Sequence, residues 1–275
     1  MAASTPDYDQ YQSAFHSAFR AELYSVLDGL PLPADGRVLD VPCGNGFYSA
    51  RLATRLGAGG RLIAVDASEE YVAQARAALA DTSGPGATEV VAGNAYELPY
   101  GDQSFDLVWC AQSLISLEPE RVVREMRRVV RADGTVAILE VDQFHHVLLP
   151  WPAELEAALA SAVLKGSVRQ YGDGVKTSPT RHLRRVLKEN DFGTIRRVTV
   201  AIDRAAPFDA ATTEFLDHHF ENFRSIVHPH LTPSLRKVYD RVTDPAESDS
   251  LYHRPESELV CINAVYLARP HSGGS

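Results

Sequence analysis

The feature that most constrains this chain is a short apolar run that ends in an acidic residue and is followed by a loop of small residues, Val38-Leu39-Asp40-Val41-Pro42-Cys43-Gly44-Asn45-Gly46. The apolar part predicts a β-strand, and the residues from Phe47 onward predict the first turns of a helix. Gly44 and Gly46 permit backbone angles and a close approach that a side chain would prevent. A sharp strand-to-helix turn of this kind can bind the phosphate or ribose part of a nucleotide.

An acidic residue follows the glycine loop at the spacing that is typical of nucleotide-binding folds. Arg61 to Val65 predicts a second strand, and Asp66 comes directly after it, roughly 20 residues beyond the loop. At this spacing a carboxylate accepts hydrogen bonds from ribose hydroxyls. A third strand is expected to begin at Thr88 and to end near Asn94, whose polar side chain can meet the edge of a base.

The rest of the chain continues this alternation of strands and helices. Four more segments have strand composition, and amphipathic segments separate several of them; the four are residues 104–110, 134–141, 194–202 and 259–267. Such alternation is typical of a parallel sheet with helices on both faces. We therefore expect an α/β protein with a doubly wound, seven-stranded sheet.

In this order the motifs resemble those of the class I S-adenosylmethionine-dependent methyltransferases, particularly the small-molecule enzymes of ubiquinone and menaquinone biosynthesis. Several motifs carry the resemblance: Asp40, Gly44 and Gly46 in the first loop, Asp66, Gly93-Asn94-Ala95, Leu98 to Asp106, and Arg131-Ala132-Asp133-Gly134 before the fifth strand. It covers residues ~35–140 and extends to the remainder by architecture only. The resemblance implies a Rossmann-like fold and S-adenosyl-L-methionine as the cofactor.

The resemblance also implies which residues hold the cofactor: Tyr11, Asp40, Pro42, Gly44, Gly46, Asp66, Asn94, Ala95 and Gln112. Two positions depart from the family pattern. Pro42 replaces the first glycine and has no amide donor, so nearby amides such as those of Cys43 and Gly44 would hold the methionine part. Asn94 replaces an aspartate, and its carbonyl would accept from the adenine amino group without the charge. The backbone of Ala95 would then meet the adenine ring.

A nicotinamide-dependent oxidoreductase shares the strand, the glycine loop and the acid. Its fingerprint is G-x-G-x-x-G, whereas the residue three positions after Gly46 is Ser49. The signatures around Asn94 and Asp106 have no role in that scheme. The sequence therefore favours the methyltransferase interpretation.

Composition limits the class of protein further. The chain has 275 residues and no low-complexity linker, which favours one methyltransferase domain, residues 1–275. We expect it to comprise an N-terminal helical cover over 1–34, a core over 35–204 and 257–270, and a helical lid over 205–256. The net charge of −9 disfavours a nucleic-acid partner. The absence of a signal peptide or a membrane-length apolar run, together with three scattered cysteines, predicts a cytoplasmic protein that does not bind membranes.

The lid is expected because about 50 residues separate the last two strands, far more than a hairpin loop contains. Asp209 is placed to cap a helix. Apolar residues then recur at helical spacing: Phe215, Leu216, Phe220, Phe223, Ile226 and Val227. Such a helix must bury this stripe, and it would do so by covering the active site or by joining a partner in a homodimer.

Three histidines are the candidate catalytic residues. His145 and His146 follow the fifth strand, where open sheets bind ligands, and His219 lies beside the apolar stripe. A histidine base is needed only if the acceptor is a hydroxyl or a protonated amine, and each of the three can equally be a packing residue. No metal site is expected, because the histidine pairs at 218–219 and 228–230 lack the i, i+4 spacing of a helical zinc site.

The function that these features predict is methyl transfer from S-adenosylmethionine to an oxygen, nitrogen or carbon atom of a small-molecule acceptor, in bacterial secondary metabolism. An alternative function has the same fold but no methyl transfer. In that case the protein would bind the cofactor and catalyse a rearrangement without methylation, or act as a regulatory binding module.

Overall fold

The computed structural model describes residues 8–141, 146–171 and 179–271, and it contains two compact units. We call the first the helical unit; it is built from residues 1–23, 142–177 and 201–262. We call the second the sheet unit; it is built from residues 24–141, 178–200 and 263–275. Each unit is therefore assembled from segments that are far apart in the chain.

The sheet unit has the expected α/β architecture. Its strands run in the order β3-β2-β1-β4-β5-β8, with β7 paired to β8. Their bounds are β1 Arg37–Asp40, β2 Arg61–Asp66, β3 Ala87–Ala92, β4 Phe105–Ala111, β5 Val130–Glu140, β7 Phe192–Ala205 and β8 Glu258–Pro270. β3, β2, β1, β4 and β5 are parallel, whereas β8 is antiparallel to β5, with Tyr266 opposite Ile138. The doubly wound, Rossmann-like fold is confirmed.

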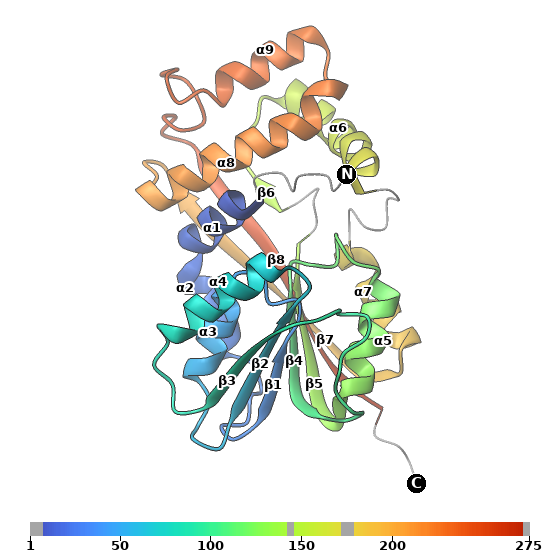
Figure 1. Ribbon diagram of the computed structural model, residues 1–275. Helices are drawn as coiled ribbons and strands as arrows, with labels where there is room; N and C mark the ends of the chain where they lie inside the picture. The colour runs from blue at the N-terminus through green and yellow to red at the C-terminus, as the bar shows by residue number, and fades with distance from the viewer. Residues whose placement is uncertain (1–7, 142–145, 172–178, 272–275) are drawn as a thin grey trace. The chain divides into compact units, whose positions relative to one another are not determined.

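Helices cover both faces of this sheet. The helices are α2 Arg20–Asp28, which begins in the helical unit, α3 Phe47–Thr54, α4 Glu69–Ala80, α5 Pro119–Val129 and α7 Pro179–Glu189. Successive side chains of a strand point to opposite faces. The ring of Trp109 packs against the ring of Tyr48 in α3, with 5.5 Å between ring centres. The next residue, Cys110, points to the other face and lies in the apolar core that also includes residues of α5 and α7. The pair α3 and α4 and the pair α5 and α7 are each seen together in Figure 1.

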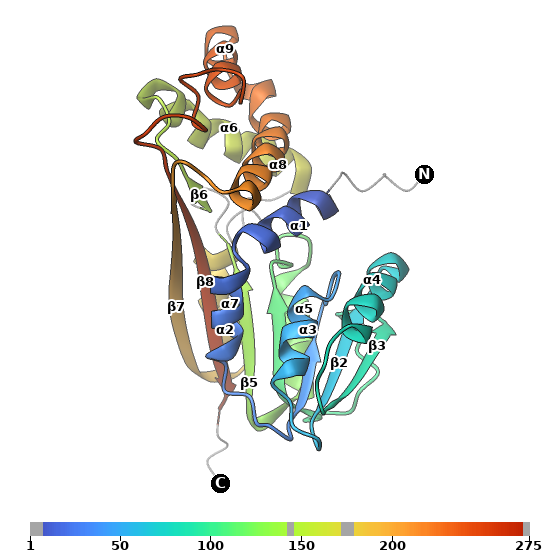
Figure 2. The same cartoon turned by 90° about the vertical axis from the view of Figure 1, so that its left-hand side faces the viewer.

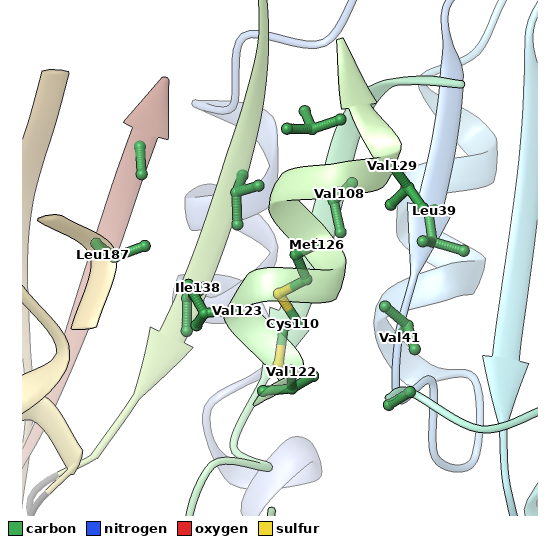
Figure 3. Close-up of a cluster of buried hydrophobic side chains, with 14 of the residues drawn as sticks. Leu39, Val41, Val108, Cys110, Val122, Val123, Met126, Val129, Ile138 and Leu187 are labelled. Atoms are coloured by element: carbon green, nitrogen blue, oxygen red, sulfur yellow. The ribbon is translucent and has the colours of Figure 1, made fainter. Parts of the chain in front are cut away.

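The core of the sheet unit lies between β4, β5 and α5. Figure 3 shows Val122, Val123 and Met126 of α5 directed at Val108 and Ile138 of the sheet. These side chains are fully buried, and burial of each one contributes roughly 1.5–3 kcal/mol. The apolar stripe of α5 therefore explains why this helix is held firmly against the middle of the sheet.

The helical unit contains α1 Tyr8–Ala18, α6 Ala153–Tyr171, α8 Ala210–Val227, a 3-10 turn η1 His228–His230 and α9 Pro233–Val242. Figure 2 shows α6, α8 and α9 grouped together, with α1 beside α8. The Asp209 carboxylate accepts from the amide of Thr212 at 2.7 Å, so the expected helix cap is confirmed. Helices α8 and α9 form the helical insertion between the last two strands.

Three local expectations need correction. The N-terminal helix is divided at Phe19 into α1 and α2, although the backbone bonds from Phe19 to Phe15 and from Leu23 to Phe19 are kept. β5 begins at Val130 and includes the segment 131–134 that was expected to precede the fifth strand, because its pairing with β4 shifts register there. A two-residue eighth strand, β6 Val147–Leu148, pairs with β8.

Within the described ranges, every helix is too short or too polar to cross a bilayer. The division of the chain into cover, core and lid stays a prediction.

Candidate functional site

The glycine loop lies between β1 and α3, as expected, and its two glycines have different roles. Gly44 and Gly46 have φ angles of 51° and 84°, which side-chain-bearing residues adopt only with strain. A Cβ on Gly46 would lie 2.8 Å from the Cα of Ala75, so this glycine permits close packing of α3 against α4. A Cβ on Gly44 would meet no atom within 4 Å, so at this position the loop borders open space. Gly44 is therefore the position at which a ligand can approach the backbone.

Asp66 is bonded to the glycine loop. Its carboxylate accepts from the amide of Gly44 at 2.9 Å and, through its other oxygen, from the amide of Ser68 at 2.9 Å. An ionised carboxylate has about four acceptor positions, so two amide bonds leave capacity for ribose hydroxyls. The same side chain thus orders the loop and remains able to bind a ligand.

Two further amides of the loop donate hydrogen bonds to backbone carbonyls of the same chain. The Cys43 amide donates to the Val65 carbonyl at 2.9 Å, and the Gly46 amide donates to the Cys43 carbonyl at 3.1 Å. Pro42 has no amide to contribute. These contacts fasten the loop to β2. The amides of Cys43 and Gly44, which were expected to hold the methionine part, therefore each already donate their one hydrogen within the chain.

The Asp40 carboxyl lies beneath the loop and is 1% exposed. It accepts a hydrogen bond from Ser49 Oγ at 2.5 Å. Burial, with a contribution from the charge of Asp66, raises the pKa of Asp40 to about 7. Burial and the two neighbouring carboxylates also raise the pKa of the Cys43 thiol far above its ordinary range. Cys43 therefore stays protonated near neutral pH and is unsuited to act as a nucleophile.

The third strand ends beside the second, at the same edge of the sheet. Asn94 is exposed, and its Oδ1 accepts from the amide of Tyr96 at 3.0 Å. This bond uses one of the two acceptor positions of the side-chain carbonyl. Ala95, directly after it, is buried against the apolar core. The pair is thus held by a local turn, and an adenine contact by Asn94 stays a prediction.

Gln112 follows β4 with a φ of 52°, and its Oε1 accepts from Tyr48 Oη at 3.3 Å. The loop at Gln112 is fixed by a residue that sequence reasoning missed. Glu140, at the end of β5, accepts from the amides of Ser113 and Leu114 at 2.8 and 2.7 Å. Burial raises the pKa of Glu140 to about 7. The only signal in the sequence is a single acid at the end of a continuous apolar strand.

The other predicted site residues belong to the helical unit. Tyr11 of α1, His146 beside β6 and His219 of α8 line one cavity of about 220 Å³. His219 lies parallel to the Phe223 ring, with 5.4 Å between ring centres and 15° between ring planes. Burial, with a smaller contribution from His146, lowers the pKa of His219 to about 3, and burial lowers the pKa of His146 to about 4. His145 lies outside the described residues.

These pKa values change the chemical role that the histidines can have. A general base works best when its pKa lies near the operating pH. His146 and His219 are neutral at pH 7 and bind a proton weakly, so we interpret them as hydrogen-bonding groups instead of the expected bases. Across residues 8–141, 146–171 and 179–271, no cluster of three or more His, Cys, Asp or Glu side chains is arranged to hold a metal ion.

Comparison with known proteins agrees with this geometry. Residues 39–138 match the family described as a methyltransferase domain. The chain is 38% identical over 150 residues to 27-O-demethylrifamycin SV methyltransferase of Amycolatopsis mediterranei, a match that covers 53% of this chain and 49% of that protein. It is 33% identical over 129 residues to demethylmenaquinone methyltransferase of Bacillus mycoides, covering 46% and 53%. The chain thus spans about half the length of these curated relatives.

Solved structures share the fold at low sequence identity. An S-adenosylmethionine-dependent methyltransferase from Thermotoga maritima has a TM-score of 0.54 at 16% identity and covers 96% of this chain and 95% of its own. The YcgJ protein from Bacillus subtilis has a TM-score of 0.56 at 16% identity and covers 94% and 100%. These structures therefore share the fold of this chain. Within this fold, the segment that matches the methyltransferase domain, residues 39–138, contains the glycine loop and Asp66.

Proposed function

We propose that this protein transfers the methyl group of S-adenosylmethionine to a small-molecule acceptor. One observation carries the proposal. Within residues 39–138, the Asp66 carboxylate accepts a hydrogen bond from the amide of Gly44, and the space next to the Cα of Gly44 is open. A carboxylate next to an approachable stretch of backbone supports this proposal, because a nucleoside cofactor needs an acceptor for its ribose hydroxyls and close access to the loop.

The residues of the sheet unit have distinct roles in this proposal. Asp66 accepts from the ribose hydroxyls, Gly44 and Gly46 permit approach to the loop, and Asn94 and Ala95 contact the adenine. Gln112, held by Tyr48, borders the cofactor next to the end of β4. When bound, S-adenosylmethionine supplies an activated methyl group on a positively charged sulfur. The protein then contributes alignment and exclusion of water.

The acceptor is proposed to be a small molecule of bacterial secondary metabolism. The name of the Amycolatopsis relative describes methylation of a demethylated rifamycin, which supports an acceptor of this class. The net charge of −9 supports a partner other than nucleic acid. All three cysteines are buried, and Cys43 and Cys110 are free thiols, which supports a reaction in the cytoplasm, where thiols stay reduced. The receiving atom and a homodimer stay predictions.

The experiment that tests cofactor binding is calorimetric titration of the full chain with S-adenosylmethionine and with S-adenosylhomocysteine. Asp66→Ala should weaken binding by roughly tenfold to a hundredfold, because a charged hydrogen-bond acceptor is worth about 1.5–3 kcal/mol. Asp81→Ala is the matched control, since Asp81 is an exposed acid at the other end of α4. Equal affinities in wild type and Asp66→Ala would overturn the assignment of the ribose site.

Turnover is tested separately by supplying candidate acceptors together with isotopically labelled S-adenosylmethionine. Labelled product and S-adenosylhomocysteine should appear in equal amounts. Tight binding of the cofactor with no S-adenosylhomocysteine formed from a broad acceptor panel would favour a non-methylating rearrangement or a regulatory binding module.

A further inference from the structure

The helical unit contains a cavity that shares no residue with the glycine loop. Its volume is about 220 Å³, and residues of α1, β6, α6 and α8 form its walls. For comparison, a cavity of about 150 Å³ holds one benzene ring. The cavity therefore has room for a substituted ring or a pair of fused rings.

Five of the fourteen lining residues carry a flat ring. His219 lies parallel to Phe223, and Tyr11 approaches His219 with 6.2 Å between ring centres. Trp151 lines the cavity and stacks on Tyr239 behind it, with 5.7 Å between centres and 16° between planes. Aromatic walls pack best against another flat ring, by offset stacking or by edge-to-face contact.

Two buried ring nitrogens of the lining have no hydrogen-bond partner. They are Nε2 of His146 and Nδ1 of His219, and both side chains are at least nine-tenths buried. Leaving a buried polar group unpaired costs about 1–3 kcal/mol. A neutral imidazole offers one donor and one acceptor, so either atom can bind a hydroxyl group, which both donates and accepts. An unpaired buried nitrogen in a cavity large enough for a ring indicates a binding site, because a bound ligand would supply the missing hydrogen bond.

The charges around the cavity select the ligand further. The two histidines are neutral, because burial keeps both pKa values well below 7. The acidic side chain of Glu156 also lines the cavity and is exposed. Among the residues that the structure describes, none of those lining the cavity is Lys or Arg, so an anionic ligand finds no fixed positive charge on this lining. The lining thus favours an uncharged molecule.

We propose that this cavity is the acceptor-binding site, and that it holds an uncharged aromatic ring whose hydroxyl group bonds to His146 or His219. This inference rests on the proposed function, because it calls the bound molecule a methyl acceptor. The histidines bind and orient the ring; they are not bases in this proposal. It narrows the acceptor from any small molecule to a hydroxylated aromatic compound.

The test uses the full chain and three probes that differ in one feature: 2-naphthol, naphthalene and 2-naphthoate. Calorimetric titration is performed with and without saturating S-adenosylhomocysteine. We expect 2-naphthol to bind about tenfold more tightly than naphthalene, as one net hydrogen bond predicts, and 2-naphthoate to bind most weakly. If the three probes bind alike, or if none binds, the proposal is wrong.

Variants assign the effect to the histidines. His219→Phe keeps a ring but removes the polar atom, so it should lose the preference for 2-naphthol and keep naphthalene binding. His219→Asn restores a polar atom near the position of Nδ1 and should recover the preference. For His146, the corresponding pair is His146→Phe and His146→Gln. His218→Phe, the neighbouring residue on α8, is the matched control, since it does not line the cavity.

The result separates the two proposals. If both His→Phe variants keep the full preference for 2-naphthol, the cavity assignment fails whatever the cofactor does. Affinity for S-adenosylmethionine, measured on the same variants, should be unchanged, because the cavity shares no residue with the glycine loop. Loss of cofactor binding in wild type would contradict the proposed function while leaving the ring-binding measurement interpretable. Circular dichroism confirms that each variant is folded.

Discussion

Asp40 ends β1 as a fully buried carboxyl whose hydrogen-bond partner is the hydroxyl of Ser49. Its pKa, raised to about 7 by burial and by Asp66, lies above the ordinary value of 3.8. Between these two values the folded state binds more protons than the unfolded state. The free energy of unfolding therefore falls as pH rises from about 4 to about 7, and this loss is complete above pH 7.

Asp40→Asn removes this titration. The free energy of unfolding of the variant, relative to wild type, should increase from pH 4 to pH 7 by an amount on the order of 1–4 kcal/mol, and then level off. Urea denaturation of both proteins over this pH range measures the difference. Asp81→Asn, at an exposed position, serves as the control. A difference that is independent of pH would show that Asp40 is ionised in the folded protein throughout.

At the scale of elements, Glu140 connects the end of β5 to the loop after β4. One oxygen of its carboxyl, Oε1, accepts from the amides of both Ser113 and Leu114. The neighbouring Gln112 is thereby held at the edge of the sheet, where parallel strands bind ligands. A buried acceptor that serves two amides explains how a left-handed residue such as Gln112 is kept in place.

The pair Glu140→Gln and Glu140→Leu tests this connection. The glutamine side chain keeps an oxygen that can accept from both amides, so its free energy of unfolding at pH 7 should stay close to that of wild type. The leucine side chain leaves two buried amides unpaired and should cost about 2–6 kcal/mol, at 1–3 kcal/mol for each amide. Chemical denaturation of the two variants distinguishes the outcomes. Equal destabilisation by glutamine and leucine would mean that the negative charge matters and the hydrogen bonds do not.

At the scale of the whole molecule, the helical insertion is the part that can be removed most cleanly. The amide of Ala206 donates to the carbonyl of Ser257 at 2.9 Å, so the two ends of the insertion are adjacent. The apolar core of the sheet unit contains none of the residues between them. Within the helical unit, however, Phe215 of α8 packs on Phe15 and Phe19, with ring centres 5.8 and 5.0 Å apart.

Replacing residues 207–256 with a short glycine-containing turn should therefore preserve binding of S-adenosylmethionine and abolish binding of 2-naphthol. Gel filtration identifies the monomeric fraction, and calorimetry on that fraction measures both ligands. The full-length His219→Phe variant is the comparison, since it should lose only the hydroxyl preference. A truncated protein that is monomeric but has lost cofactor affinity would contradict the independence of the two sites.

The sequence alone determined the parts of this protein that depend on neighbours in the chain. The strand, glycine loop and helix at Val38 to Phe47 and the acid at Asp66 are readable because residue type and spacing decide local backbone geometry. The alternation of strands and helices along the chain also predicted the parallel sheet. A helix that connects two neighbouring parallel strands almost always makes a right-handed crossover, which limits the possible topologies. The cap at Asp209 belongs to the same class of local signals.

Only the tertiary structure decided which distant residues share an environment. Glu140 became the partner of two amides because β4 and β5 are neighbours in the sheet. Tyr11, His146 and His219 come from three separate segments and meet in one cavity, and the depth of their burial set the low pKa values of the two histidines. Desolvation depends on every atom packed around a group, which no local pattern in the sequence records. For this reason the cofactor loop was predictable, whereas the acceptor cavity was not.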